Sequence, residues 1–167
     1  FRSFMNIEAR DAAGVTPVQA LFDSINALKD KNELATFFGE NQKNGVGSPL
    51  AFYISVDAKD STRYATHIWQ SGLGLPDRDY YFNDAERFEK LRSGYLAHIE
   101  NMFNLAGLKD GKAAAETIMA LETKLAGFHW TKVESRDSTK RYNKFDVADL
   151  NTVTDAFNWT AYLAAQG

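Results

Sequence analysis

Few residues in this sequence have the types and spacing that catalysis or metal binding requires. The three histidines, His67, His98 and His129, are 31 residues apart, whereas the H-E-x-x-H zinc motif places two histidines four residues apart on a helix. An isolated histidine is more often structural, so we expect a structural role at each position. The sequence has no cysteine, which excludes thiolate metal ligands, disulfides and a thiol nucleophile.

Other catalytic patterns are equally sparse. No G-x-S-x-G elbow marks a serine nucleophile, and the glycines at 45, 47, 72 and 74 form neither G-x-G-x-x-G nor a phosphate-binding loop. Carboxylates are plentiful, but Glu116 and Glu122 are not at helical neighbour spacing. A Ser–His–Asp triad or a hydrolase that uses two carboxylates therefore stays open, although the sequence selects no residues for either.

The most unusual segment is Ser-Gly-Leu-Gly-Leu-Pro-Asp-Arg-Asp-Tyr-Tyr at residues 71–81. We expect a strand exit, a bend permitted by glycine and a proline turn that leads to a helix, with Asp79 capping backbone N–H groups. The two tyrosines are expected to bury their rings while their hydroxyls find partners. A functional role also stays open, because loops on rigid scaffolds often face substrates. The residues of this structural motif are Gly72, Gly74, Pro76, Asp79, Tyr80 and Tyr81.

The elements that must position this loop are mostly helical. Thr16 and Pro17 are suited to begin a helix, Gly39 and Gly107 to end one, and residues 41–48 read as a loop. The apolar stripe of the last long helix is expected to contain Leu121 and Phe128. Apolar spacing predicts helices at about 17–28, 34–38, 84–106 and 112–128, and short ones begin near Asp146 and Asn158.

One β signal interrupts the helices. Residues 50–56 and 63–69 are rich in β-branched and aromatic side chains, and residues 57–62 are typical of a turn. Alternation places Phe52, Ile54 and Val56 on one face, and Tyr64, Thr66 and Ile68 on one face of the partner strand. A lone hairpin is marginal in water. The predicted fold class is therefore mainly α, with one β-hairpin at about residues 50–69 packed on helices.

Length and composition indicate the size of the domain and argue against some classes of partner. With 167 residues, 44% hydrophobic and 25% charged, the chain has the size and composition of one ordinary globular domain. A net charge of −3 without a basic patch argues against a nucleic-acid partner. No apolar stretch is long enough for a membrane span. The sequence opens on Phe1 rather than Met, and we expect that both ends are severed from a longer protein.

The segment Gly-Leu-Gly-Leu-Pro-Asp-Arg-Asp-Tyr-Tyr at residues 72–81 is similar to a signature of the N-terminal part of neprilysin-like metallopeptidases. The resemblance covers essentially the whole chain, in order. The segments that also resemble the family are Arg2–Met5, Gly14 with Pro17, Asp57–Ser61, Leu121–Leu125, His129–Lys132, Arg136 with Asp137, Tyr142–Phe145 and Phe157–Leu163.

This resemblance implies a two-domain enzyme that cleaves short peptides in a closed cavity, with zinc in a thermolysin-like domain and a helical cap that limits access. Residues 1–167 resemble one fragment of the cap, the N-terminal lid domain, without the C-terminal zinc domain. No catalytic or metal residue is carried over, so zinc belongs to the parent enzyme and none is expected on this fragment. Asp77 and Arg78 are the candidates for contact with the substrate cavity, where the Arg78 guanidinium would bind carboxylate or carbonyl groups.

The leading hypothesis is therefore a non-catalytic segment of a zinc endopeptidase, with peptide substrates and the C-terminal domain as partners. The alternatives are a stand-alone helical binding or scaffold module and an unrelated hydrolase. The lack of cysteine differs from the disulfide-bearing animal members and favours a bacterial one, located in the periplasm or cell envelope. A fragment of a larger cap is also expected to expose apolar surface and self-associate.

Overall fold

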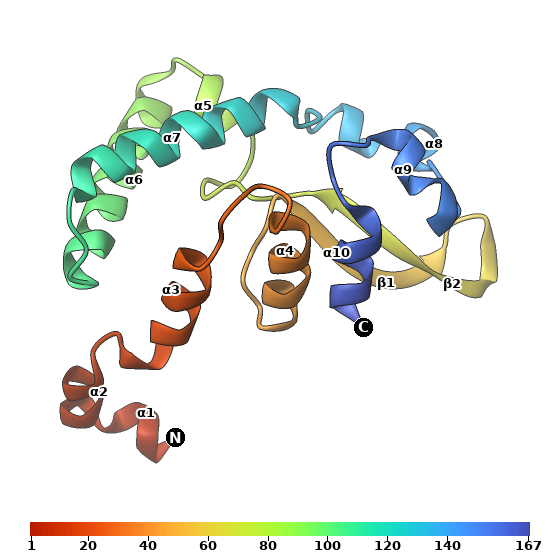
Figure 1. Cartoon of the computed structure of the whole chain (residues 1–167). Coiled ribbons are helices and arrows are strands. Elements are labelled where there is room, and N and C mark those ends of the chain that lie inside the picture. The colour runs from red at the N-terminus through yellow and green to blue at the C-terminus, as the bar shows by residue number, and fades with distance from the viewer.

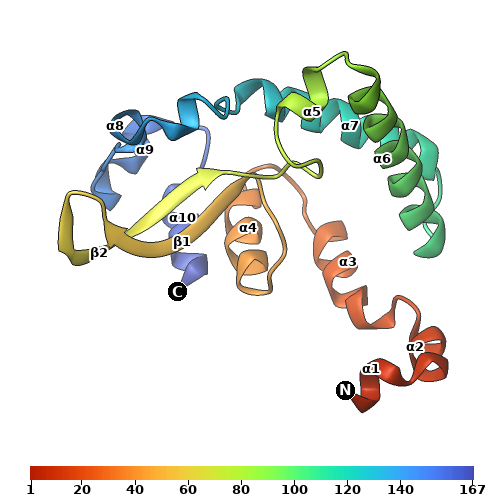
Figure 2. The ribbon, with the colours of Figure 1, turned by 180° about the vertical axis from the view of Figure 1, so that it is seen from behind.

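The computed structural model describes all residues, 1–167, as helices arranged around one two-stranded hairpin (Figures 1 and 2). No helix is both long enough and apolar enough to traverse a lipid bilayer. The predicted class, mainly α with one hairpin, is confirmed. The elements are α1 (Arg2–Met5), α2 (Ile7–Ala13), η1 (Thr16–Val18), α3 (Gln19–Asn26), α4 (Leu34–Lys43), β1 (Leu50–Asp57), β2 (Asp60–Gln70), α5 (Asp79–Phe82), α6 (Glu86–Leu105), α7 (Gly111–Phe128), η2 (Glu134–Arg136), α8 (Ser138–Arg141), η3 (Val147–Asp149), α9 (Leu150–Val153) and α10 (Trp159–Gln166).

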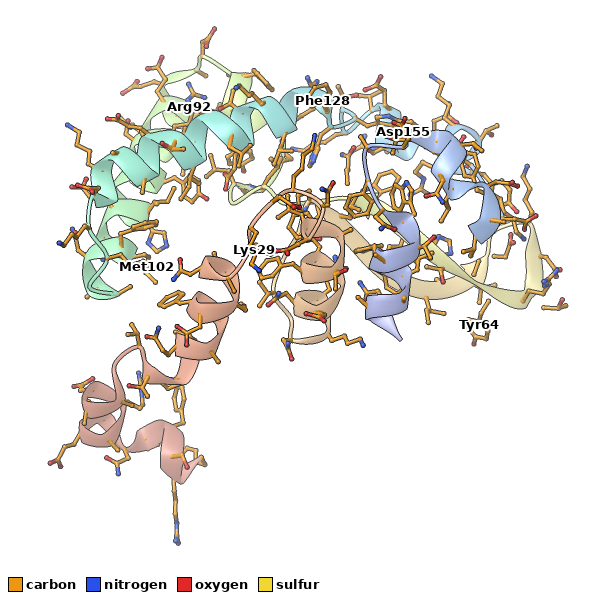
Figure 3. The ribbon with its side chains drawn as sticks, viewed as in Figure 1. Lys29, Tyr64, Arg92, Met102, Phe128 and Asp155 are labelled. Atoms are coloured by element: carbon orange, nitrogen blue, oxygen red, sulfur yellow. The ribbon has the colours of Figure 1, made fainter.

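The hairpin pairs β1 with β2 antiparallel, and the pairing brings the two predicted faces together on one side of the sheet. Phe52 lies opposite Ile68, Ile54 opposite Thr66, and Val56 opposite Tyr64. The turn is shorter than predicted, because residues 60–62 belong to β2 and only Ala58 and Lys59 lie between the strands. The predicted face is largely open to solvent, since Tyr64 is 77% exposed and projects outward (Figure 3).

Helix α4 packs side by side with α10, at the point where the sequence placed a helix end. Gly39 does not end α4, which runs on to Lys43, so the predicted loop begins three residues later than expected. A Cβ at Gly39 would lie 2.6 Å from the Ala165 Cβ and 2.7 Å from the Tyr162 carbonyl oxygen. The glycine is therefore there for the close approach of two helices, a role that local sequence does not reveal. Tyr162 is fully buried at this contact.

Helices α6 and α7 form an antiparallel pair whose bounds agree with the prediction. Gly107, at φ 70°, follows the C-terminus of α6 as expected. Gly111 opens α7 at a close contact, because a Cβ there would lie 2.9 Å from the Glu100 carbonyl oxygen. The apolar stripe of α7 is rotated from the predicted one: Leu121 and Phe128 are 57% and 85% exposed, whereas Ala115 and Ala126 are buried.

The N-terminal segment, helices α1 to α3 with η1, extends away from the rest of the chain (Figures 1 and 2). None of these elements contains a buried residue, and Phe1 is 96% exposed. Thr16 and Pro17 begin a 3₁₀ turn rather than the α-helix that was predicted, and no side chain caps it. The predicted short helices near Asp146 and Asn158 are present, and the Asn158 side chain accepts from Ala161 N.

Candidate functional site

The loop at residues 71–81 leaves β2 and crosses to the α6–α7 pair. Gly72 adopts φ +87°, and a Cβ there would lie 2.8 Å from the Pro49 Cα. A Cβ at Gly74 would lie 1.8 Å from the Tyr95 hydroxyl oxygen. Close contacts therefore favour glycine over any larger residue at both positions of the motif. At Gly72 the positive φ favours glycine as well.

Glu122 on α7 holds this loop through three neutral donors. Its Oε2 accepts from the Tyr81 hydroxyl at 2.6 Å and from Gly74 N at 3.2 Å. Its Oε1 accepts from the Tyr95 hydroxyl at 2.9 Å. The Tyr81 hydroxyl oxygen in turn accepts from Leu75 N at 3.0 Å. We call this arrangement the Glu122 clamp.

The spacing of Glu122 from other carboxylates does not mark it as a site residue. Its position on the packed face of α7 would have done so. Glu122 lies three residues after Met119 and four before Ala126, on the face of α7 that packs against the loop. A carboxylate on a buried helix face requires hydrogen-bond donors from elsewhere in the fold. The donors are tyrosine hydroxyls and a loop amide, which confirms the expectation that Tyr81 finds a polar partner.

Burial and the clamp together raise the pKa values of its two tyrosines. Burial, followed by the hydrogen bond to the Glu122 carboxylate, raises the pKa of Tyr95 to about 12. The same two causes, in the same order, raise the pKa of Tyr81 well above its ordinary value. A phenol with the ordinary pKa of about 10 is already protonated at neutral pH, so the raised values extend the range in which both tyrosines donate to the clamp towards higher pH.

The helical turn α5 within the loop has no side-chain cap, so Asp79 does not take the capping role expected from the sequence. Instead, the Asp77 Oδ1 accepts from Asp79 N at 2.9 Å, in a turn that leads into the helix. Tyr80 packs its ring edge-on against Phe88, with 5.1 Å between centroids. The Tyr80 carbonyl oxygen accepts from Arg92 Nη1 at 2.9 Å, and Figure 3 labels Arg92 on α6.

An open cleft of about 410 Å³, which we call the loop cleft, lies between this loop and the segment that follows α7. Both sequence candidates line it. Arg78 donates from Nε to the Ala126 carbonyl oxygen at 3.2 Å, and Asp77 forms an ion pair with Lys132 at 2.8 Å. The lining residues are Trp69, Gln70, Ser71, Gly72, Leu73, Leu75, Pro76, Asp77, Arg78, His129, Trp130, Lys132, Ser135 and Arg136.

The charged lining of the loop cleft is predominantly cationic. Arg78, Lys132 and Arg136 face a single carboxylate, Asp77. His129 donates from Nε2 to the Ser71 carbonyl oxygen at 3.2 Å. Burial and, to a smaller extent, the nearby Arg78 charge lower the pKa of His129, despite the opposing effect of this hydrogen bond. The imidazole is therefore neutral at pH 7, and the cleft has an excess of positive charge suited to polar or anionic groups.

The structure places the other histidines away from this cleft. His98 is exposed on α6, and His67 lies on β2 in a different cavity. No group of three His, Cys, Asp or Glu side chains is arranged to hold a metal ion. Sequence reasoning missed His129, Lys132 and Arg136 as cleft residues, because they follow Arg78 by 51 to 58 positions and only the path of α7 brings them to the loop.

Comparisons with known proteins show which family this chain is similar to. The sequence matches the family described as "Peptidase family M13" over residues 1–167. It is 40% identical over 117 residues to endothelin-converting enzyme 1 of Cavia porcellus, covering 68% of this chain and 15% of the relative. Endothelin-converting enzyme-like 1 of Homo sapiens is 31% identical over 173 residues, covering 95% and 22% of the two chains.

Comparison with solved structures supports the same family. The crystal structure of Mycobacterium tuberculosis zinc metalloprotease Zmp1 in complex with an inhibitor matches with a TM-score of 0.89 and 39% identity, covering 99% of this chain and 25% of that one. A partial open state of the same zinc metalloprotease matches with a TM-score of 0.74. The chain thus spans about a quarter or less of the length of these relatives. Family and fold together confirm the neprilysin-like resemblance of the loop: the chain belongs to peptidase family M13.

Proposed function

We propose that the chain is a non-catalytic lid, or substrate-access segment, of a zinc metalloendopeptidase that hydrolyses short peptides. The observation that carries the proposal is the match along 99% of the chain to about a quarter of a zinc metalloprotease, at 39% identity. Residues 1–167 would then be one segment of the N-terminal helical lid. Its partners would be the C-terminal zinc domain and the peptide substrates.

Zinc would belong to that C-terminal domain, because the donors of this chain do not fit a catalytic site. Such a site needs three protein ligands that converge on one ion, and no such group is present among these side chains. Bound zinc supplies activated water for peptide hydrolysis. No step of the reaction is assigned to a residue of this chain.

The loop cleft is the surface through which this segment would contact substrate. Arg78 is half-buried and anchored through Nε by the Ala126 carbonyl, with its guanidinium over the Phe82 ring at 5.5 Å. Its terminal nitrogens make no hydrogen bond within the chain, which leaves them for peptide carboxylate or carbonyl oxygens. Asp77 would orient this surface through its ion pair with Lys132.

The test is Arg78→Ala in the full-length enzyme, assayed on a panel of short peptides with and without acidic residues. We expect kcat/KM to fall about tenfold for peptides whose carboxylate meets Arg78 and to change little for the others, since one charge-assisted hydrogen bond is lost. Arg87→Ala is the matched control, because its guanidinium also lies over a phenylalanine ring but lines no part of the cleft. Equal kcat/KM values across the panel for Arg78→Ala and wild type would refute the role of Arg78.

The assignment to a peptidase has its own tests. Reading the gene beyond Gly167 should show H-E-x-x-H, whereas a stop without that motif would favour a stand-alone scaffold module. The purified 167-residue chain should neither cleave a fluorogenic peptide nor retain stoichiometric zinc. Zinc-dependent cleavage by this chain would instead require a site that uses His67, His98 or His129.

Two further expectations belong to the same proposal. Phe128 is 85% exposed and Figure 3 shows it at the end of α7, so we expect the isolated chain to self-associate through apolar surface, which sedimentation measures. A compact monomer would contradict this expectation. We also propose the periplasm or cell envelope of a bacterium as the location, which cell fractionation checks.

A further inference from the structure

A second cavity, of about 270 Å³, lies between one face of the hairpin and the segment at residues 138–144. We call it the hairpin cavity. Trp69 separates it from the loop cleft and lines both.

The walls of the hairpin cavity are tied together by a buried carboxylate. Asp57, 3% exposed at the hairpin turn, accepts from Lys144 Nζ at 2.6 Å, from the Tyr142 hydroxyl at 3.0 Å and from Lys59 N at 2.9 Å. The Lys59 ammonium lies 4.2 Å from the centroid of the Tyr142 ring. Residues 142 and 144 are therefore attached to the turn 85 and 87 positions earlier in the chain. This attachment gives the cavity a defined shape.

An unpaired polar atom lies within this cavity wall. The Nε2 atom of His67 is buried and has no hydrogen-bond partner, although the ring is held in place by stacking on Tyr53, with 5.0 Å between centroids and 6° between planes. Leaving a buried polar atom unpaired costs about 1–3 kcal/mol, so such atoms normally have a partner. The other polar lining next to His67 includes Ser55, whose hydroxyl is also without a hydrogen bond in the chain.

A cation without an anionic partner lies at the mouth of the same cavity. The Arg141 guanidinium is exposed and lies over the Trp69 ring, 5.9 Å from its centroid. It makes no ion pair, in contrast to Lys144, which is neutralised by Asp57. Arg141 and His67 thus both line a cavity whose walls include the aromatic rings of Tyr53 and Trp69.

We propose that the hairpin cavity binds a carboxylate group, with Arg141 at the mouth and His67 Nε2 inside as its hydrogen-bond donors. A guanidinium matches the two oxygens of a carboxylate in a bidentate geometry, and the imidazole N–H would supply one more donor. Inorganic phosphate has four oxygens and, as the dianion, a higher charge, so two side-chain donors would leave it underbonded. The aromatic rings of Tyr53 and Trp69 suit the apolar part of a small acid or peptide end.

The experiment is NMR titration of the 167-residue chain with N-acetylglycine, which presents a terminal carboxylate, and with N-acetylglycinamide as its neutral match. The signals monitored are those of His67 Nε2 and Arg141 Nε. We expect saturable shifts of both with N-acetylglycine and none with the amide. The α-amide of N-acetylaspartic acid then distinguishes a side-chain carboxylate from a terminal one.

Substitutions test whether N-acetylglycine binds at the hairpin cavity. Arg141→Gln and His67→Phe should each weaken N-acetylglycine binding by about tenfold, the usual cost of one charge-assisted hydrogen bond. Arg87→Gln, which removes a cation that lines neither cavity, should leave it unchanged, and the amide spectrum of each variant verifies its fold. The proposal is overturned if neither signal saturates, if the neutral amide binds as tightly, if inorganic phosphate binds more tightly, or if both variants bind like wild type.

Discussion

Two carboxylates hold the two surfaces of this molecule in different ways. Glu122, on α7, accepts from the Tyr81 hydroxyl and the Gly74 amide of the loop at residues 71–81, and from the Tyr95 hydroxyl on α6. Asp57, at the hairpin turn, accepts from an ammonium and a hydroxyl of the segment at residues 142–144 and from an amide within the turn itself. The main difference is the partner charge: every donor to Glu122 is neutral, whereas Asp57 has a cation.

The electrostatic consequences differ accordingly. The Lys144 ammonium and the Lys59 amide hold the pKa of Asp57 well below its ordinary value, and the same ion pair raises the pKa of Lys144. Around Glu122 the perturbed groups are the tyrosines, whose pKa values rise after burial beside a carboxylate. The contacts of Asp57 therefore depend on a charge pair, whereas those of Glu122 depend on neutral phenols. Different solution conditions should weaken each of them.

The largest expected effect comes from removing the neutral-donor clamp. Glu122→Ala leaves two partly buried tyrosine hydroxyls and the Gly74 amide without their acceptor. We expect a loss of about 3 kcal/mol in the free energy of unfolding, since hydrogen bonds to a charged group each contribute about 1.5–3 kcal/mol. Denaturant unfolding monitored by tyrosine fluorescence measures this loss.

The control for this change is Glu122→Gln, which keeps one acceptor oxygen and should lose less than half as much. Hydrogen exchange at the Gly74 amide should accelerate in the alanine variant while the amides of α4 and α10 keep their rates. An alanine variant as stable as wild type would show that the clamp does not hold the loop.

A smaller effect is expected from the charge-paired clamp. Asp57→Asn keeps a similar shape but removes the charge that binds Lys144, and Lys144 is half-exposed, so its ammonium can return to water. We expect a lower melting temperature than wild type, but a smaller decrease than in Glu122→Ala. Thermal unfolding by circular dichroism checks the order of the two variants.

Salt sharpens the distinction between the two clamps. In 1 M salt the Debye length falls to about 3 Å, so the Asp57–Lys144 pair should weaken while the hydrogen bonds to Glu122 persist. Wild type should then lose stability with salt, and Asp57→Asn should lose less. Equal salt dependence in the two proteins would contradict the charge-pair description.

The smallest expected effects are the opposite pH limits of the two clamps. The pKa of Asp57 is lowered in the folded chain, so its contribution is present above its unfolded pKa of about 3.9 and is lost as the pH falls below that value. The pKa of Tyr95 is raised to about 12, so its contribution is present below about pH 10 and is lost as the pH rises towards 12. Unfolding measured from pH 2 to 12 tests both limits.

Each limit should disappear with its own carboxylate. Asp57→Asn should flatten the acid limb and also reduce part of the alkaline limb, because the hydrogen bond to Asp57 raises the pKa of Lys144, and burial together with the hydrogen bond to Asp57 raises the pKa of Tyr142. Glu122→Gln should reduce the alkaline limb and leave the contribution of Asp57 to the acid limb unchanged. If either variant flattens both limbs equally, the contacts of Glu122 and those of Asp57 are coupled and are not independent.

Much of the local structure follows from the sequence alone. The extents of α6 and α7, the alternating faces of β1 and β2 and the bend at Gly72 all rest on side-chain periodicity or turn chemistry within a few residues. Such patterns survive any tertiary arrangement, because they reflect backbone preferences and the burial of one face. The loop signature likewise identified the family, which the match to residues 1–167 confirms.

Only the tertiary structure decided which residues meet. Gly39 reads as a helix end until α10 packs against it, and Glu122 reads as an ordinary helical carboxylate until the loop, 48 positions away, donates to it. Arg78 was identified from its motif, but the cations that share its cleft were not. Contacts such as these, between residues 48 to 126 positions apart, depend on how helices pack, and pairwise spacing along the chain carries no information about that packing.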